Sequence, residues 1–389
     1  MLSSNSQKII NSFPTSKIPS YKLTNQEENI IKDLLLKIDL SNKRAKSLIE
    51  NKKILINAQP CVIKDFIKEI SSYWVCKNIK ENCLKNIDYC IEIKTVIYKT
   101  NTTIKIFLNS NDLNLFKYNS LDTEILLTTL ILLYSFSKKK TSIPINITFI
   151  FSTVKRYFPT SDLDIVGPCN LNGGYAEPNK KLVVYRKEEW LKVFIHECMH
   201  YFSLDSGLQI SLKNNYLSTL FNIDPDILLS ESYCEYWARI LNCLISGYKI
   251  LPDKNVWEVN KKYILYLLEA ERFYSLILLS NFLQKVNLKY DQIISNDYTL
   301  YKENTNAIAY IVITAILMNQ YGFFLLWFKK YNFPLLRFDK SINVDLFIEE
   351  IYKKCNTPEL LKCLSLIKKK KYNLKLNNSS RMSSIELKY

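Results

Sequence analysis

The segment Val193-Phe-Ile-His-Glu-Cys-Met-His-Tyr-Phe202 contains the only two histidines of this 389-residue chain, His196 and His200, with Glu197 next to the first. In this composition the pattern arises by chance on the order of 10⁻³ times per chain. Histidines four residues apart share one face of a helix, where both imidazoles can reach one Zn²⁺. Glu197 then lies beside the open metal position and can accept a proton from water. The segment predicts a zinc site with Glu197 as general base; the alternative is a solvent-facing histidine pair without a role.

The residues around this motif predict a helix with two different faces. Apolar side chains recur at helical spacing and form one stripe: Leu191, Phe194, Ile195, Cys198, Met199 and Phe202. At about 100° per residue, both histidines and Glu197 lie on the opposite side. We therefore expect one face of the helix to pack into the core and the other to carry the chemistry.

A catalytic zinc usually has three protein ligands, and no third histidine exists to supply the last one. The next strong helical pattern holds Glu231 and Glu235 one turn apart on the same face. We assign Glu231 to the metal and Glu235 to the N–H of a ligating imidazole. Asp205, five residues after His200, is the rival ligand. A surface helix with two solvated glutamates is the alternative for the pair.

The same helical pattern offers other groups. We expect it to begin with Asp224 as cap and Pro225 at its first position. Tyr233, Tyr236 and Arg239 carry donors that could stabilise an oxyanion. The sequence leaves open which of them does so, and whether they are core or surface groups instead.

The chain divides by pattern into four parts: residues 1–90 (arm and helical region), 91–250 (catalytic core), 251–366 (helical domain) and 367–389 (basic polar tail). A capping box, Thr24 with Glu27, starts a first helix over 25–38, and a second helical stretch covers 62–88. Strands are expected at 93–99, 103–108, 145–152 and 181–186, with an apolar helix at 123–136. Strands and helices thus predict an α+β fold.

The composition limits which partners and which cellular location we expect for this protein. Lys and Arg exceed Asp and Glu by 53 to 37, a net charge of +16, which permits a weak association with nucleic acid. The apolar run 307–328 is interrupted by Asn319, Gln320 and Gly322, so we expect a buried helix or helix pair rather than a membrane span. The ten cysteines form no Cys-x-x-Cys pair, and no secretory signal starts the chain. We expect reduced cysteines and an intracellular, non-secreted protein, with the polar tail solvated.

The pattern His196-Glu-x-x-His200 followed by Glu231-x-x-x-Glu235 resembles the gluzincin group of zinc metallopeptidases. The order of strands, backing helix, metal helix and glutamate helix is similar to theirs. The resemblance implies a zincin-like core in which His196, His200 and Glu231 bind zinc and Glu197 is the general base. Glu235 stands where many members carry Asp. No downstream histidine is present, so the transition-state-stabilising group is unassigned.

In the gluzincin fold the strand before the metal helix borders the cleft and pairs with an extended substrate. Here this strand is 181–186. The resemblance thereby implies Val183, Val184 and Tyr185 as substrate-edge residues.

The chain also resembles a set of HExxH proteins encoded by nucleocytoplasmic large DNA viruses. The likeness is carried by residues 183–197, by Glu303-Asn-Thr-Asn306 and by Arg381-Met-Ser-Ser-Ile-Glu386, and it covers most of the chain from about residue 93. It implies a viral peptidase located in the host cytoplasm or the virion, without naming a substrate.

Three hypotheses follow. The first is a zinc-dependent endopeptidase that acts on peptide or protein substrates, viral polypeptides among them. The second is a virion structural or interaction protein whose zinc site is structural or inactive; a fourth ligand from the protein, or a site covered by the C-terminal helices, would favour it. The third is a nucleic-acid-associated particle component, whose binding would weaken steeply with salt.

Overall fold

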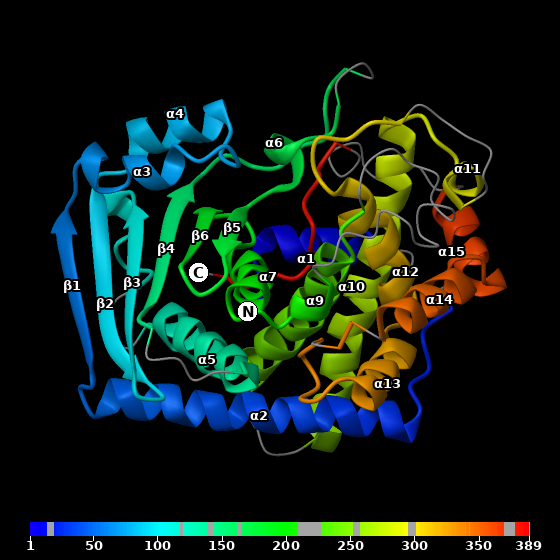
Figure 1. Cartoon of the computed structure of the whole chain (residues 1–389), viewed down its shortest axis with the longest axis horizontal. Coiled ribbons are helices and arrows are strands. Elements are labelled where there is room, and N and C mark those ends of the chain that lie inside the picture. The colour runs from blue at the N-terminus through cyan, green and yellow to red at the C-terminus, as the bar shows by residue number, and fades with distance from the viewer. Residues whose placement is uncertain are drawn as a thin grey trace.

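The protein has an α+β fold in which a mixed sheet lies beside a large helical region (Figure 1). The computed structural model describes residues 1–13, 19–116, 120–138, 143–161, 165–208, 227–251, 257–294, 301–338, 340–341, 343–368 and 378–388. Its mixed sheet and its N- and C-terminal helical regions confirm the predicted fold class.

Within the residues that the structure describes, the sheet has six strands in the order β1-β2-β3-β4-β6-β5. Their bounds are β1 Ile54–Pro60, β2 Tyr89–Ile97, β3 Thr100–Leu108, β4 Ile145–Ser152, β5 Gly174–Glu177 and β6 Lys181–Arg186. The three central strands, β3, β4 and β6, run parallel to one another. At one end β2 pairs antiparallel with β3 and β1 with β2, and at the other end β5 pairs antiparallel with β6. β1 was not predicted. Because it pairs with β2, the sheet extends into residues that the sequence placed in a helical N-terminal region.

The β2–β3 hairpin shows how local sequence sets the register. Ile91 and Ile93 are buried while Glu92 and Lys94 alternate with them toward the other face. The turn consists of Tyr98 and Lys99, both in the left-handed region with φ of 48° and 70°. Two consecutive positive φ values are typical of the tight turn that matches the twist of a hairpin, and they pair Ile97 with Thr100.

Helices cover both faces of the sheet. α5 (Leu121–Phe136) and α7 (Trp190–Tyr201) pack on one face, and α2 (Asn25–Glu50) runs along the molecule beneath α5 (Figure 1). The Thr24–Glu27 capping box is present, but α2 continues well past residue 38, to Glu50. The predicted helix over 62–88 is wrong as a single element. It is broken into η1 (Ile63–Asp65), α3 (Ile67–Ile70) and α4 (Lys77–Asn86), which cover the opposite face of the sheet.

The remaining helices pack mostly to one side of the sheet. They are α1 Ser4–Asn11, η2 Ser110–Asp112, α6 Pro168–Leu171, η3 Ser206–Leu208, α9 Leu229–Ile250, α10 Trp257–Lys285, α11 Tyr290–Ile294, η4 Ile308–Ile313, α12 Thr314–Asn319, α13 Tyr321–Tyr331, α14 Asn343–Cys355 and α15 Pro358–Lys368. α7 packs against α9, and α9 in turn packs against α10 and η4, so the metal-motif helix lies between the sheet and the helical region.

The apolar run 307–328 is a set of core helices. It forms η4, α12 and the start of α13, and the chain bends by 94° between α12 and α13. Nearly all of its side chains are buried within the protein. Among the described residues no single helix is long and apolar enough to cross a membrane; only this bent pair passes a test of length and composition.

The described end of the chain is not a solvated tail, so that expectation is wrong. Residues 380–385 and Leu387 are buried. The N-terminal residues pair with this segment, since Leu2 bridges Leu387 and the Ser3 N–H donates to the Glu386 carbonyl at 2.8 Å. Residues 369–377 of the predicted tail lie outside the described residues.

Candidate metal centre

Helix α7 carries the histidine motif and is anchored on almost every side. Glu189 precedes it with a left-handed φ of 58°, and the predicted apolar stripe is buried as expected. The opposite face is enclosed as well. His196 and Glu197 are only 5% and 7% exposed, and the His200 side chain is 14% exposed. The motif therefore lies in a closed interior site rather than on a surface.

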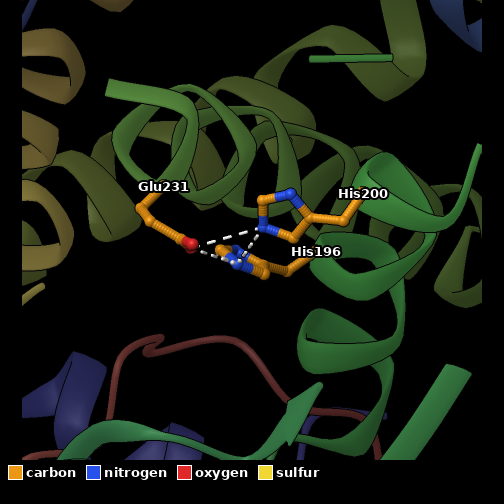
Figure 2. A group of neighbouring side chains, drawn as sticks. All are labelled: His196, His200 and Glu231. Carbon is orange, nitrogen blue, oxygen red and sulfur yellow. Dashed lines mark hydrogen bonds and ion pairs between the residues drawn. The ribbon is translucent and has the colours of Figure 1, made fainter. Parts of the chain in front are cut away.

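Helix α9 brings Glu231 to the two histidines (Figure 2). The Nε2 atoms of His196 and His200 lie 3.2 Å apart. Glu231 Oε2 lies 3.2 Å from His196 Nε2 and 3.3 Å from His200 Nε2. Three ligand atoms from two helices thus form a nearly equilateral triangle.

The size of this triangle fits one small cation. Zinc binds imidazole nitrogen and carboxylate oxygen at about 2.0–2.1 Å, and tetrahedral angles then put the ligand atoms about 3.3 Å apart. The three observed separations of 3.2, 3.2 and 3.3 Å match this value. The donor set of two neutral imidazoles and one carboxylate is also one that zinc accepts.

Each histidine has a carboxylate at its other ring nitrogen. Glu235 Oε2 lies 3.2 Å from His196 Nδ1, and Asp205 Oδ2 lies 2.8 Å from His200 Nδ1. The contact at His200 has hydrogen-bond geometry and fixes the tautomer that leaves Nε2 free to ligate a metal. The contact at His196 is an ion-pair distance without hydrogen-bond geometry. The structure therefore places Asp205 behind His200, and not beside Glu231 as the rival ligand.

A second group of ligand-type atoms lies on that side of His200. His200, Asp205 and Cys234 offer atoms within 4.8 Å of one another, with Cys234 Sγ 3.8 Å from His200 Nδ1. This group uses Nδ1, whereas the triangle with Glu231 uses Nε2. The burial of Cys234 raises the pKa of its thiol, which opposes the thiolate form that binds metals. The Glu231 triangle is thus the better-suited cation site.

Buried charges hold Glu235 in its ionised form. Burial alone would raise its pKa, but Lys192, His196 and Arg239 together hold the pKa of Glu235 well below its usual value. Lys192 Nζ lies 2.5 Å from Glu235 Oε2, and Arg239 Nε donates to Oε1 at 3.0 Å. Glu235 is therefore paired with Lys192 and Arg239 and also contacts His196.

The pKa values of Glu197 and Glu231 are shifted in opposite directions. Burial raises the pKa of Glu197, only partly offset by the two histidines. Burial acts on Glu231 in the same direction, but His200 and His196 outweigh it and hold the pKa of Glu231 well below its usual value. A ligand carboxylate should be ionised, and a proton acceptor should have a raised proton affinity, so both shifts suit the assigned roles.

A small cavity of about 30 Å³ lies next to Glu197. Its lining includes His196, Glu197, Gly173, Gly174 and Tyr310. A side chain at Gly174 would place its Cβ 2.8 Å from Glu197 Cγ and 2.7 Å from the carbonyl oxygen of Val183. The absence of a side chain there lets strand β5 approach the general-base candidate closely.

Tyr310 is the site residue that sequence reasoning missed. It lies on η4, a short π-helical segment of Ile308–Ile313, and its ring centroid is 5.8 Å from that of His196. Burial, together with the nearby Glu231 and Glu197 carboxylates, raises the pKa of its hydroxyl well above the usual value. π-helical turns occur often at functional sites, but in the sequence Tyr310 looked only like a polar interruption of an apolar run.

The oxyanion candidates on α9 have other partners, so none of them faces the metal triangle in that role. The Tyr233 hydroxyl accepts from Asn332, and the Tyr236 hydroxyl donates to the carbonyl of Tyr321. Arg239 is paired with Glu235. The proposed cap Asp224 and Pro225 lie outside the described residues.

The predicted substrate edge is also wrong. β6 lies between β4 and β5, and Val183, Val184 and Tyr185 are fully buried. Its backbone groups are used by both neighbours, so it cannot pair with a substrate. β5 is the strand at this end of the sheet; it begins at Gly174, and Gly173 directly precedes it.

Comparisons with known proteins identify a viral relative. The chain is 30% identical over 122 residues to an uncharacterized protein of Acanthamoeba polyphaga mimivirus, a stretch that covers 31% of this chain and 30% of that protein. No family model matches the chain, and no solved structure matches it. The matched stretch relates part of this chain to a giant-virus protein of unassigned activity.

Proposed function

We propose that this protein is a zinc-dependent endopeptidase. The observation that supports it most directly is the triangle of His196, His200 and Glu231, whose sides agree with tetrahedral zinc ligation. The enclosed Glu197 beside it and the carboxylates behind both imidazoles add the remaining parts of such a site. Viral polypeptides are the substrates we propose, on the basis of the giant-virus relative.

When bound, zinc would supply a Lewis acid that polarises a peptide carbonyl and lowers the pKa of water. Glu197 accepts a proton from the attacking water and passes it to the leaving amine. Its raised proton affinity and its shielding from bulk solvent both favour this transfer. His196 and His200 are held by Glu235 and Asp205, so the ligand atoms need no reorganisation during the reaction.

Two further elements complete the proposed mechanism. The Tyr310 hydroxyl, next to Glu231, is a donor for the oxygen on which negative charge develops. The outer edge of β5 can pair with an extended peptide backbone, which would present the scissile bond to Glu197 across Gly174.

The test uses the full chain with its metal content measured by mass spectrometry and its cleavage of a peptide library followed in parallel. We expect about one zinc per chain, peptide cleavage by the wild type, and loss of cleavage with zinc retained in Glu197→Gln. Glu81→Gln is the matched control, because the Glu81 side chain is 54% exposed on α4, away from the site. Undiminished cleavage in Glu197→Gln, or wild-type protein without zinc affinity, would refute the proposal.

A second candidate is a virion structural or interaction protein with a structural or inactive zinc site. The enclosure of the site favours it: a cavity of about 30 Å³ holds a water molecule or two, or one small polar group, and no large peptide side chain. Tyr310, from the C-terminal helical region, also lines this cavity and packs against the His196 ring. Stoichiometric zinc without cleavage of any peptide, together with a loss of thermal stability on zinc removal, would support this function over the first.

A further inference from the structure

Arg156 is a buried cation in the cavity of the candidate metal centre. Its side chain is 1% exposed and lines the cavity together with His196 and Glu197. Its Nη1 lies 3.3 Å from Glu189 Oε2, an ion pair without hydrogen-bond geometry. Among the residues that the structure describes, Nε has no acceptor. A guanidinium has five N–H donors, and a buried one is normally saturated.

Arg186, nearby, shows what saturation looks like. Its guanidinium donates from Nε to the carbonyl of Asn172 at 2.9 Å, from Nη1 to two further carbonyls at 2.9 and 3.0 Å, and from Nη2 to the carbonyl of Cys169 at 2.6 Å. All three guanidinium nitrogens of Arg186 thus donate to backbone carbonyls. Arg156 is equally buried, but its Nε and Nη1 groups have no hydrogen-bond acceptor among the described residues. This arrangement is expected where a bound ligand supplies the acceptors.

The surroundings of Arg156 suit a small planar anion. A Cβ at Gly173 would lie 2.3 Å from Arg156 Nη2, so the guanidinium occupies the place of a side chain just before β5. Lys192 lines the same cavity, but its ammonium is paired with Glu235 at 2.5 Å, so the Arg156 guanidinium is the group that would bind the anion. The cavity of about 30 Å³ admits a group the size of a carboxylate and excludes a large apolar side chain. Carboxylates bind guanidinium groups through paired hydrogen bonds.

We propose that Arg156 binds a carboxylate of the peptide substrate, so that the site selects peptides with a negative charge near the scissile bond. This inference rests on the proposed peptidase function. An endopeptidase would take the carboxylate from an Asp or Glu side chain; a free C-terminus offers the same chemistry at the guanidinium, and a preference for it would make the enzyme a carboxypeptidase instead.

The binding test uses the full-length, zinc-loaded Glu197→Gln protein, in which binding is observed without turnover. The probes are fluorescein-labelled hexapeptides in matched pairs: free C-terminal carboxylate against C-terminal amide, and Asp against Asn at each internal position. We expect one anionic member to bind about 10- to 100-fold tighter than its neutral partner, as charge-assisted hydrogen bonds predict. The terminal pair and the internal pairs distinguish the two sources.

Variants then locate the preference. Arg156→Gln in the same background should abolish it, and Arg156→Lys should keep only part, because lysine lacks the planar fork. Lys155→Gln, which removes an exposed charge next in the chain, should leave it intact. Equal binding of the anionic and neutral peptides, no binding of any peptide, or a preference that survives Arg156→Gln would each overturn the inference, and the first two need no folded Arg156 variant.

The same peptides given to the zinc-loaded wild type separate the two proposals. A carboxylate preference in binding without cleavage of any peptide refutes the peptidase function and supports the anion site. Cleavage without a difference between the paired peptides refutes the anion site and supports the peptidase.

Discussion

Gly174→Ala tests whether the close approach of β5 to Glu197 matters. The added Cβ would lie 2.7 Å from the Val183 carbonyl oxygen and 2.8 Å from Glu197 Cγ, with Glu197 Oε1 at 3.0 Å. Ordinary contacts of this kind are about 3.5 Å or longer, so relief requires a shift of roughly half an ångström or more. β5 must move from β6, or Glu197 must leave its position. Overpacking of this kind costs about 1–3 kcal/mol of stability.

We expect kcat to fall about 100-fold in Gly174→Ala, because displacing a catalytic group by a fraction of an ångström has effects of this size. Zinc content should not change, since Glu197 is not a ligand. The assay combines steady-state cleavage, metal analysis and a thermal melt. Gly167→Ala is the control: its Cβ would meet only ordinary contacts, at 3.6 and 3.9 Å. A Gly174→Ala variant with wild-type kcat and melting temperature would refute the steric reasoning, and loss of zinc would show that the metal ligands, not Glu197, had moved.

Three further results are expected. Asp205→Asn and Glu235→Gln should each weaken zinc binding about 10- to 100-fold in a chelator competition. The melting temperature should fall further in Glu235→Gln, because this variant also leaves the buried Lys192 ammonium without its carboxylate. Unchanged zinc affinity in both variants would contradict the imidazole contacts. Tyr310→Phe should lower kcat by about 100-fold with zinc content and KM nearly unchanged, and a change confined to KM would argue against transition-state stabilisation. Burial raises the pKa of Glu303 to about 8, so its contribution to stability is complete below about pH 4 and is lost as the pH rises toward 8; Glu303→Gln should flatten the fall in melting temperature between about pH 5 and 8, and an unchanged slope would show that other groups cause it.

The sequence was sufficient for the parts of the centre that follow local periodicity. Two histidines one turn apart must share a helix face, and a second helix with paired glutamates offered Glu231 and Glu235 for the remaining positions. The structure brings all four side chains together. It also resolves the choice that spacing left open for Asp205, which approaches the outer nitrogen of His200 because the chain turns back immediately after α7.

The sequence could not show features that depend on strand order or on long-range packing. β6 has the apolar residue pattern of a strand buried on both faces. The local sequence does not show that the four-residue strand β5 pairs with β6 and forms the edge of the sheet. Tyr310 lies more than 100 residues from the motif, on a π-helical turn that has no recognisable spacing. The pair Gly173–Gly174 next to a strand was the local signal for β5, because paired glycines at a strand indicate a close approach of the backbone to another group.

The segment from Arg381 to Glu386 explains why the metal centre cannot be understood from the motif helices alone. Arg239, which donates to Glu235, also faces Glu271 at 3.7 Å, and Glu271 Oε2 accepts from the Ser384 N–H at 2.9 Å and its hydroxyl at 2.8 Å.

The other end of the same segment holds the start of α7. The Glu189 N–H donates to Glu386 Oε1 at 2.9 Å, and the Glu189 carboxylate accepts from the Met382 N–H at 3.1 Å. A buried carboxylate is retained only where such partners offset its desolvation, and the partners of Glu189 and Glu271 come largely from this one segment. The segment therefore fixes both Glu189, the residue that precedes α7, and, through Arg239, the carboxylate behind His196. This is a physical reason for three of its polar side chains, Arg381, Ser383 and Ser384, to be buried in a region where composition alone predicted solvent exposure.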